Sequence, residues 1–164
     1  MIDRINNKEM DKLRANECIA SNTDTKLVNI RVGYRDTDKM GYVHHSQYLV
    51  YYEFARLEYF RELGISYKEI EDKGIMMPVI AAKLDYKSPA FYDDVLTIKT
   101  KLNIVGAKFI FQSEIINSDN KIINKGTIQV VCIDSISRKP IKPYKFIANL
   151  IDKKIEVNIN AKTT

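Results

Sequence analysis

Consecutive segments with strand character follow Pro78, and they limit the folds that this chain can adopt. Their approximate ranges are 78–87, 94–105, 108–117 and 122–134. Gly106 and the run Ser118-Asp119-Asn120 separate the last three segments, and turns this short usually join antiparallel neighbours. The sequence therefore predicts an antiparallel sheet built as a meander.

A long helix is expected before this sheet, from about Ser46 to Leu63. Ser46 is the expected N-cap, and Gly64 stands where a left-handed residue is needed at the end. Apolar and aromatic residues recur at spacings of three and four, which predicts a stripe for burial against the sheet. The members of this stripe are Tyr48, Tyr52, Ala55, Tyr59 and Leu63.

Two shorter elements flank the long helix. The alternation of apolar and polar residues from Leu27 to Arg35 predicts a half-buried first strand. Ser66 and Glu69 form an expected capping box for a short helix that ends near Asp72. The order of strand, long helix and four strands predicts the α+β class with an antiparallel sheet.

The 164 residues are of single-domain size. Residues 1–26 lack sustained apolar periodicity, so we expect a mobile extension there, with a helical turn near 10–20. The domain is predicted to cover 27–155, including a helix at about 144–153, and 156–164 are expected to form a tail.

Composition favours a globular protein, with 45% hydrophobic and 29% charged residues. No apolar run approaches the roughly 20 residues that span a bilayer, and the N-terminus lacks a signal-peptide core. A cytoplasmic location is therefore expected.

Cys18 and Cys132 lie far apart without metal-ligand spacing, so neither a disulfide nor a metal site is predicted from them. Cys132 is expected to be a small buried hydrophobe.

The net charge of +5 leaves two kinds of partner to consider. Lys and Arg are scattered among Asp and Glu, and no signature of a nucleic-acid-binding fold is present, so no nucleic-acid partner is predicted. A modest positive field also suits a ligand with several phosphates. Charge by itself does not choose between these partners.

The segment from Tyr34 to Tyr48 holds the residues best suited to chemistry. It places acids, a glycine and both histidines of the chain just before the expected helix. An acid beside the N–H groups of a helix N-terminus can attack or deprotonate at an acyl carbon, while the helix stabilises negative charge on the carbonyl oxygen. The residues concerned are Asp36, Asp38, Gly41, His44 and His45.

This segment resembles the hotdog-fold acyl-CoA thioesterases of the 4-hydroxybenzoyl-CoA thioesterase family, most closely the branch associated with the bacterial Tol-Pal envelope system. The matching residues are Asp36, Asp38, Gly41, Val43, His45 and Tyr48. The stretches from Tyr51 to Arg56 and from Ser88 to Leu96 match as well, so the resemblance covers about 27–150. It implies a hotdog fold, in which an antiparallel sheet wraps around a long central helix. It also implies homodimers or homotetramers with sites at subunit interfaces.

The resemblance makes Asp38 the expected catalytic acid, because it occupies the position of the family's essential Asp. Asp38 could attack the thioester to form a mixed anhydride, or act as general base on water, and the sequence leaves both routes open. A turn-capping role is the structural alternative. Asp36 is expected to hold the loop through backbone N–H groups. Gly41, predicted to contact substrate, suits a loop that needs positive φ or a close approach to the ligand.

His45 matches the family's histidine and is the second expected catalytic residue. Its N–H could donate to the thioester oxygen, and its imidazole could orient water or protonate the departing thiolate. His44 has no such match and is expected in the pocket wall or at the surface. The adjacent histidines project differently and no third ligand stands at a recognisable spacing, so no metal site is predicted.

Other residues are expected to bind the substrate. Val43 and Tyr48 belong to the matching pattern and could line the acyl or thioester region. Lys87 and Lys108 are the candidates for binding the phosphates of coenzyme A, and a solvated lysine is the alternative for each.

The expected activity is hydrolysis of an acyl-CoA thioester to a carboxylic acid and free coenzyme A. No cofactor is expected, because coenzyme A is part of the substrate. One alternative is a non-catalytic acyl-thioester-binding or envelope-associated protein on the same scaffold. Another is a hotdog dehydratase, whose different Asp and His arrangement is not found in the sequence. Asp38 favours the hydrolase, because a binding protein does not need an acid aimed at the thioester.

Overall fold

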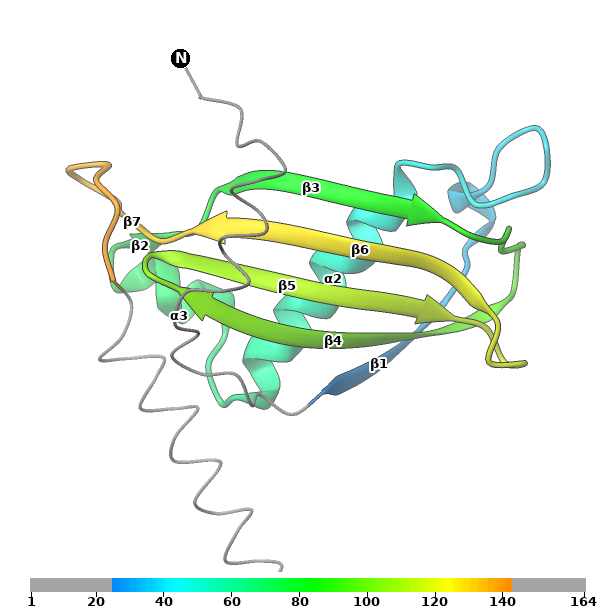
Figure 1. Ribbon diagram of the computed structural model, residues 1–164, viewed down its shortest axis with the longest axis horizontal. Helices are drawn as coiled ribbons and strands as arrows, with labels where there is room; N and C mark the ends of the chain where they lie inside the picture. The colour runs from blue at the N-terminus through cyan, green and yellow to red at the C-terminus, as the bar shows by residue number, and fades with distance from the viewer. Residues whose placement is uncertain (1–24, 143–164) are drawn as a thin grey trace, which may run out of the picture.

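The computed structural model describes residues 25–142 (Figure 1). The helical segments expected at 10–20 and 144–153, and the tail expected at 156–164, lie outside these residues. The elements in chain order are β1 (Lys26–Arg31), the 3-10 turn η1 (Tyr34–Asp36), α2 (Gln47–Glu62), α3 (Tyr67–Asp72), β2 (Ile75–Met76), β3 (Val79–Tyr86), β4 (Val95–Val105), β5 (Lys108–Ile116), β6 (Ile122–Val131) and β7 (Ile133–Asp134).

A five-stranded sheet with the order β1-β4-β5-β6-β3 forms the body of the protein. All of its strand pairs are antiparallel, and α2 crosses one face of the sheet (Figure 1). β2 and β7 pair in a second, two-stranded sheet. The predicted α+β class with an antiparallel sheet is confirmed, and β3 lies at one edge of the larger sheet.

The core lies between α2 and the sheet. Along β4, alternate residues are buried beneath α2, while Lys99 and Lys101 point to the opposite face. The predicted stripe on α2 is also buried, and Tyr51 and Phe60 widen it into a broad apolar surface. The tyrosine-rich helix therefore packs a row of aromatic rings against the sheet.

One sequence prediction near α2 was wrong in its bounds, and another is confirmed in position only. The first strand ends at Arg31 instead of reaching Arg35, because the Asp36 carboxylate accepts the Gly33 N–H at 2.9 Å and closes η1. Ser46 does occupy the N-cap position, but its hydroxyl makes no cap hydrogen bond. The hydroxyl instead lies 2.8 Å from Nδ1 of His44.

Other local predictions are confirmed. Ser66 and Glu69 form the capping box of α3, and Gly64 follows α2 with a φ of +85°. The segment expected as one strand at 122–134 is divided at Cys132, after which β7 leaves the main sheet to pair with β2. Cys132 is buried as expected, and burial raises the pKa of its thiol to about 12.

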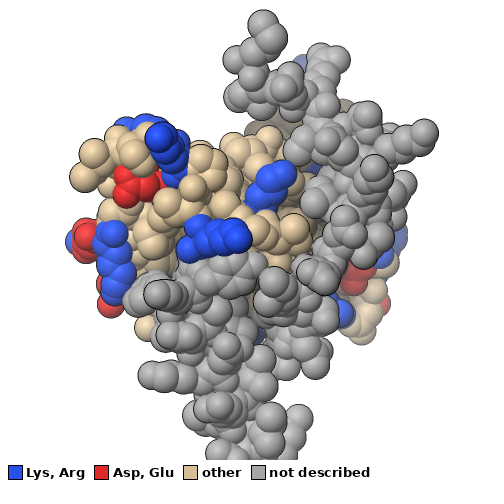
Figure 2. Space-filling view, turned by 60° about the vertical axis from the view of Figure 1, so that its left-hand side comes forward, with Lys and Arg blue, Asp and Glu red and all other residues tan. Residues whose placement is uncertain are grey.

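None of the helices within 25–142 combines the length and apolar character required to cross a membrane. Figure 2 shows the Lys and Arg side chains on one side of the molecule as separate groups, with acidic side chains close to some of them. On that side, the basic residues are interspersed with uncharged surface.

We predict that the protein loses stability between pH 10 and 12 because of the tyrosines of α2. Burial raises the pKa of Tyr48 to about 12, and it raises the pKa values of Tyr51 and Tyr52 as well. Unfolded tyrosine ionises near pH 10, so alkali removes protons from the unfolded chain first. The free energy of unfolding should therefore fall, by up to about 1.4 kcal/mol per pH unit for each tyrosine.

Urea titrations at pH 9, 10 and 11 test this expectation. Tyr52→Phe removes one titrating group, so its free energy of unfolding should depend less steeply on pH than that of the parent protein. Identical pH slopes for the two proteins would contradict the assignment.

Candidate active site

A cavity of about 410 Å³ opens between the loop before α2 and the end of β3. Its volume lies within the range of small-molecule sites, roughly 300–1,000 Å³. The residues that line it are Asp38, Met40, Tyr42, Val43, His45, Tyr48, Tyr86, Lys87, Ser88 and Pro89. The fold thus brings together five of the residues predicted from the sequence: Asp38, Val43, His45, Tyr48 and Lys87.

Asp38 organises a tight turn at the wall of the cavity. One of its carboxylate oxygens, Oδ1, accepts the Met40 N–H at 2.8 Å, and its carbonyl accepts the Gly41 N–H at 2.9 Å. Gly41 completes the turn with a φ of +80°, which a residue with a side chain rarely adopts. The second carboxylate oxygen accepts no hydrogen bond from any residue between 25 and 142. Asp38 therefore caps a turn and still has an oxygen available to a ligand.

Asp36 supports the loop from the protein interior, as expected. Its Oδ2 accepts hydrogen bonds from the Gly33 N–H and the Tyr51 hydroxyl, each at 2.9 Å. Its backbone carbonyl accepts the His44 N–H at 2.8 Å. These contacts hold the loop against α2 and fix the position of the segment that forms the cavity wall.

His45 lies just before the first turn of α2. Its imidazole is exposed and lies against the ring of His44, with 4.1 Å between the ring centres. Its backbone N–H has no acceptor within the described part of the chain. The His45 carbonyl accepts a hydrogen bond from the Tyr86 hydroxyl at 3.1 Å. A free N–H at a helix entrance is a ready donor for a developing negative charge.

Tyr48 and Tyr86 form the aromatic side of the cavity. Tyr48 is buried, and its ring meets that of Tyr86 edge-on, with the ring centres 5.5 Å apart. Sequence reasoning did not identify Tyr86 as a site residue, because it lies 41 residues from the histidine that it contacts. Two sequence signals pointed to this segment: the prediction of Lys87 as a phosphate ligand and the family match of Ser88 and Pro89.

The two lysines predicted to bind phosphates lie apart. Lys87 lines the cavity, whereas Lys108 begins β5 opposite Val131. The cavity end of the sheet is marked by Asn124, which pairs with Tyr86 on β3 and with Ile115 on β5. The seven residue-to-residue steps from Lys108 to Ile115 span about 23 Å of strand. Within one chain, the structure does not bring Lys108 to this cavity.

The described residues hold no group of three or more His, Cys, Asp and Glu side chains arranged for a metal ion. The cavity instead presents one free carboxylate oxygen, one free backbone N–H, one imidazole and one lysine. Such a set can bind a polar carbonyl group and deliver an oxygen nucleophile to it.

The sheet wrapped on a long helix is the hotdog fold. A solved structure with this arrangement is the DHNA-CoA thioesterase from Staphylococcus aureus, with a TM-score of 0.73 and 28% identity, covering 84% of this chain and 95% of that chain. The protein SAV2348 from the same organism, solved in complex with CoA, shares the fold with a TM-score of 0.73 at 14% identity, covering 81% of this chain and 87% of that chain.

The chain belongs to the thioesterase-like superfamily, whose pattern it matches over residues 32–151. The acyl-CoA thioester hydrolase YbgC of Escherichia coli O6:H1 is 34% identical over 112 residues, which cover 68% of this chain and 84% of that protein. The putative acyl-CoA thioesterase YneP of Bacillus subtilis is 34% identical over 114 residues, covering 69% and 83%. The hotdog fold and the family resemblance expected from the sequence are confirmed.

Proposed function

We propose that this protein is an acyl-CoA thioesterase, which hydrolyses an acyl-CoA to a carboxylic acid and free coenzyme A. The observation that carries the proposal is the position of Asp38 and His45 at the wall of one cavity, beside the entrance of α2. The names of the relatives in Escherichia coli and Bacillus subtilis support the same reaction class.

Asp38 can drive the reaction by either of two routes. As a nucleophile, its free oxygen attacks the thioester carbonyl carbon, the C–S bond breaks, and water then hydrolyses the mixed anhydride. As a general base, the carboxylate takes a proton from a water molecule, whose oxygen attacks the same carbon before the C–S bond breaks. In both routes the thiolate of coenzyme A leaves and takes up a proton.

The His45 N–H serves as the oxyanion donor in this proposal. Negative charge develops on the carbonyl oxygen during the attack, and the N-terminus of α2 provides a partial positive charge beside it. The exposed imidazole of His45 can deliver a proton to the departing thiolate.

A free-thiol release assay over a panel of aliphatic and aromatic acyl-CoAs tests the proposed function. An acyl-CoA thioesterase should release coenzyme A from at least one member of the panel. Formation of an enoyl thioester from a hydroxyacyl substrate would indicate a dehydratase. Tight binding of acyl-CoA without any product would indicate a binding protein, and either result would overturn the proposal.

We expect His45→Ala to reduce the rate of hydrolysis by less than about a hundredfold, the lower end of what a general acid or base contributes. The substitution removes the imidazole and keeps the backbone N–H that faces the developing charge. Steady-state thiol release measures the effect, with circular dichroism to verify the fold. A loss equal to that of an Asp38 variant would show that the imidazole contributes more than this scheme assigns.

We further propose that the protein works as a homodimer or homotetramer. Support comes from β3, an edge strand whose Val79, Ile80 and Tyr86 are 53%, 38% and 53% exposed. Long apolar edge strands readily pair with another chain. Because Tyr86 also lines the cavity, a partner on this edge would lie beside the site. Sedimentation velocity at assay concentration tests this proposal, and an active monomer would contradict it.

The same proposal includes no metal or redox cofactor, because a carboxylate, water and a backbone donor suffice for the hydrolysis. Activity should survive dialysis against EDTA. A cytoplasmic location, expected from the sequence, completes the proposal, and cell fractionation would test it.

A further inference from the structure

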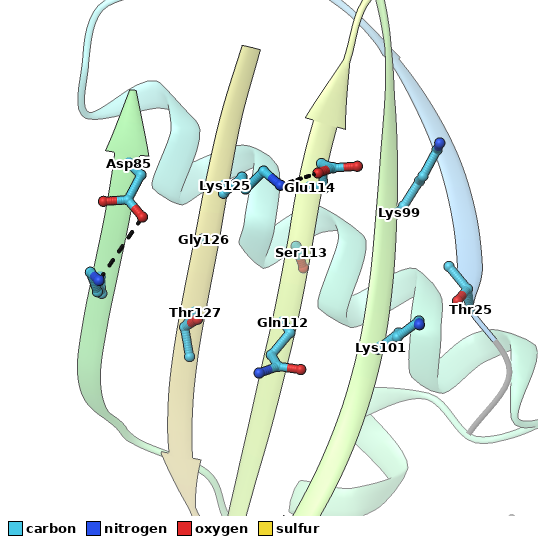
Figure 3. Close-up of a pocket in the computed structure, with 11 residues that line it drawn as sticks. Thr25, Asp85, Lys99, Lys101, Gln112, Ser113, Glu114, Lys125, Gly126 and Thr127 are labelled. Carbon is cyan, nitrogen blue, oxygen red and sulfur yellow. Dashed lines mark ion pairs between the residues drawn. The ribbon is translucent and has the colours of Figure 1, made fainter. Parts of the chain in front are cut away.

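A second cavity, of about 550 Å³, lies on the face of the sheet that points away from α2 (Figure 3). We call it the outer hollow. Four lysines and two acids line it: Lys83, Lys99, Lys101, Lys125, Asp85 and Glu114. Four positive and two negative charges leave a net charge of +2 around a polar floor. This site plays no part in the hydrolysis scheme above.

Strand register fixes how these side chains face one another. One row across the sheet consists of Lys99, Glu114, Lys125 and Asp85. The next row consists of Lys101, Gln112, Thr127 and Lys83. The intervening Thr100 is buried toward α2, so the members of both rows project into the outer hollow. Directly opposed residues in such rows lie about 5 Å apart.

The acids of the outer hollow are already paired. Glu114 forms an ion pair with Lys125 (Figure 3), and its Oε1 lies 2.8 Å from Nζ of the lysine. Asp85 lies 4.0 Å from Lys83. Lys99 and Lys101 have no acidic partner within 4.0 Å in the described part of the chain, although Lys99 stands opposite Glu114. Two ammonium groups of β4 are therefore available to an anion from outside.

The spacing of these two lysines indicates the size of the anion. Residues two apart on one face of a strand lie about 7 Å from each other, which is a distance that a diphosphate or a bisphosphate can bridge. Gln112, opposite Lys101, adds an amide donor, and Thr127 beyond it adds a hydroxyl. A volume of about 550 Å³ also leaves space for a nucleoside beyond the phosphates.

We propose that the outer hollow binds a small molecule carrying two or more phosphate charges, with Lys99 and Lys101 as its direct ligands. The phosphates could belong to the nucleotide end of coenzyme A or to a separate phosphorylated compound. Both sources present the same chemistry to the lysines, and the inference does not depend on hydrolysis.

Isothermal titration of the full-length protein with inorganic pyrophosphate, and separately with adenosine 3′,5′-bisphosphate, tests the site. We expect a Kd below about 1 mM for at least one probe at low salt, and weaker binding as salt screens the lysines. The double variant Lys99→Gln/Lys101→Gln should weaken this binding at least tenfold. No binding of either probe to the parent protein would overturn the proposal.

A matched control removes the same charge elsewhere. Lys121 and Lys139 are exposed and do not line the outer hollow, so Lys121→Gln/Lys139→Gln should bind the probe as the parent protein does. Equal losses in the two double variants would show that net charge alone attracts the probe, which would contradict a specific site. Retained affinity in Lys99→Gln/Lys101→Gln would contradict it as well. Thermal unfolding of both variants verifies that each remains folded.

Kinetics distinguish the two sources of phosphate. If the outer hollow holds the nucleotide of coenzyme A, Lys99→Gln/Lys101→Gln should raise KM for an acyl-CoA at least fivefold and leave KM for the matching acyl-pantetheine unchanged. If a separate compound occupies it, both KM values should be unchanged while the probe binding is lost. Both results require the probe binding described above. That binding is measured without any acyl substrate, so it tests the outer hollow even if the proposed hydrolysis is not observed.

Discussion

Replacing Asp38 by asparagine should lower thioester hydrolysis by at least about a hundredfold and leave the fold intact, as expected when a nucleophile or general base is removed. The asparagine side chain keeps an oxygen that can accept the Met40 N–H, so the turn at the cavity wall should persist. It loses the charged oxygen that attacks the thioester or activates water. Thiol release under saturating acyl-CoA measures the change.

Asp119→Asn serves as the matched control for this substitution. Asp119 lies in the exposed turn between β5 and β6 and does not line the cavity, and the exchange alters the same functional group. Its activity should equal that of the parent protein. Near-normal turnover by pure, folded Asp38→Asn would remove Asp38 from the mechanism and leave the cavity without its nucleophile or base.

The largest expected effect on stability comes from Gly126→Ala in β6. A Cβ added at Gly126 would lie 2.6 Å from Cζ of Tyr52 and 3.0 Å from its Cδ2, far closer than carbon atoms pack. The ring cannot easily move, because it is buried and its hydroxyl donates to Oδ1 of Asn124 at 2.6 Å. We expect a loss of about 3 kcal/mol in the free energy of unfolding, the upper end of what overpacking usually costs.

A double-mutant cycle identifies the clash as the cause. Tyr52→Ala creates a cavity and should itself destabilise the protein. In that background the added methyl group has space, so Gly126→Ala should cost much less than it does in the parent protein. Urea unfolding of the four proteins measures this coupling. If the single variant Gly126→Ala unfolded at the same urea concentration as the parent protein, α2 would be able to shift without any loss in the free energy of unfolding.

Much of the fold was predictable because its signals are local. The capping box of Ser66 and Glu69 and the left-handed Gly64 depend on residues within one turn of each other, and both were identified. The end of β1 was not, because it depends on the Asp36 carboxylate reaching back to Gly33. β2 was also missed, since two residues form a strand there only because β7 lies alongside.

The residues of the site also differ in how far they could be predicted from local sequence signals. The loop before α2 contributes Asp38, Val43 and His45 from one short segment, and a motif could identify them together. Tyr86 comes from the far edge of the sheet, and its contact with His45 exists only in three dimensions. Lys87 and Lys108 were both predicted to bind the phosphates of coenzyme A, and strand register places them at opposite ends of the sheet within one chain. The catalytic and binding roles themselves remain predictions.

The hydrogen bond from Tyr86 to the His45 carbonyl links the site to β3, which is an edge strand of the sheet within one chain. Edge strands open in local fluctuations more readily than central ones, because fewer contacts hold them. Each opening of the end of β3 would release the peptide group of His45, even while β4, β5 and β6 remain folded. If the His45 N–H acts as proposed, the proportion of molecules competent for hydrolysis depends on the local stability of β3 and can be smaller than the proportion that is folded.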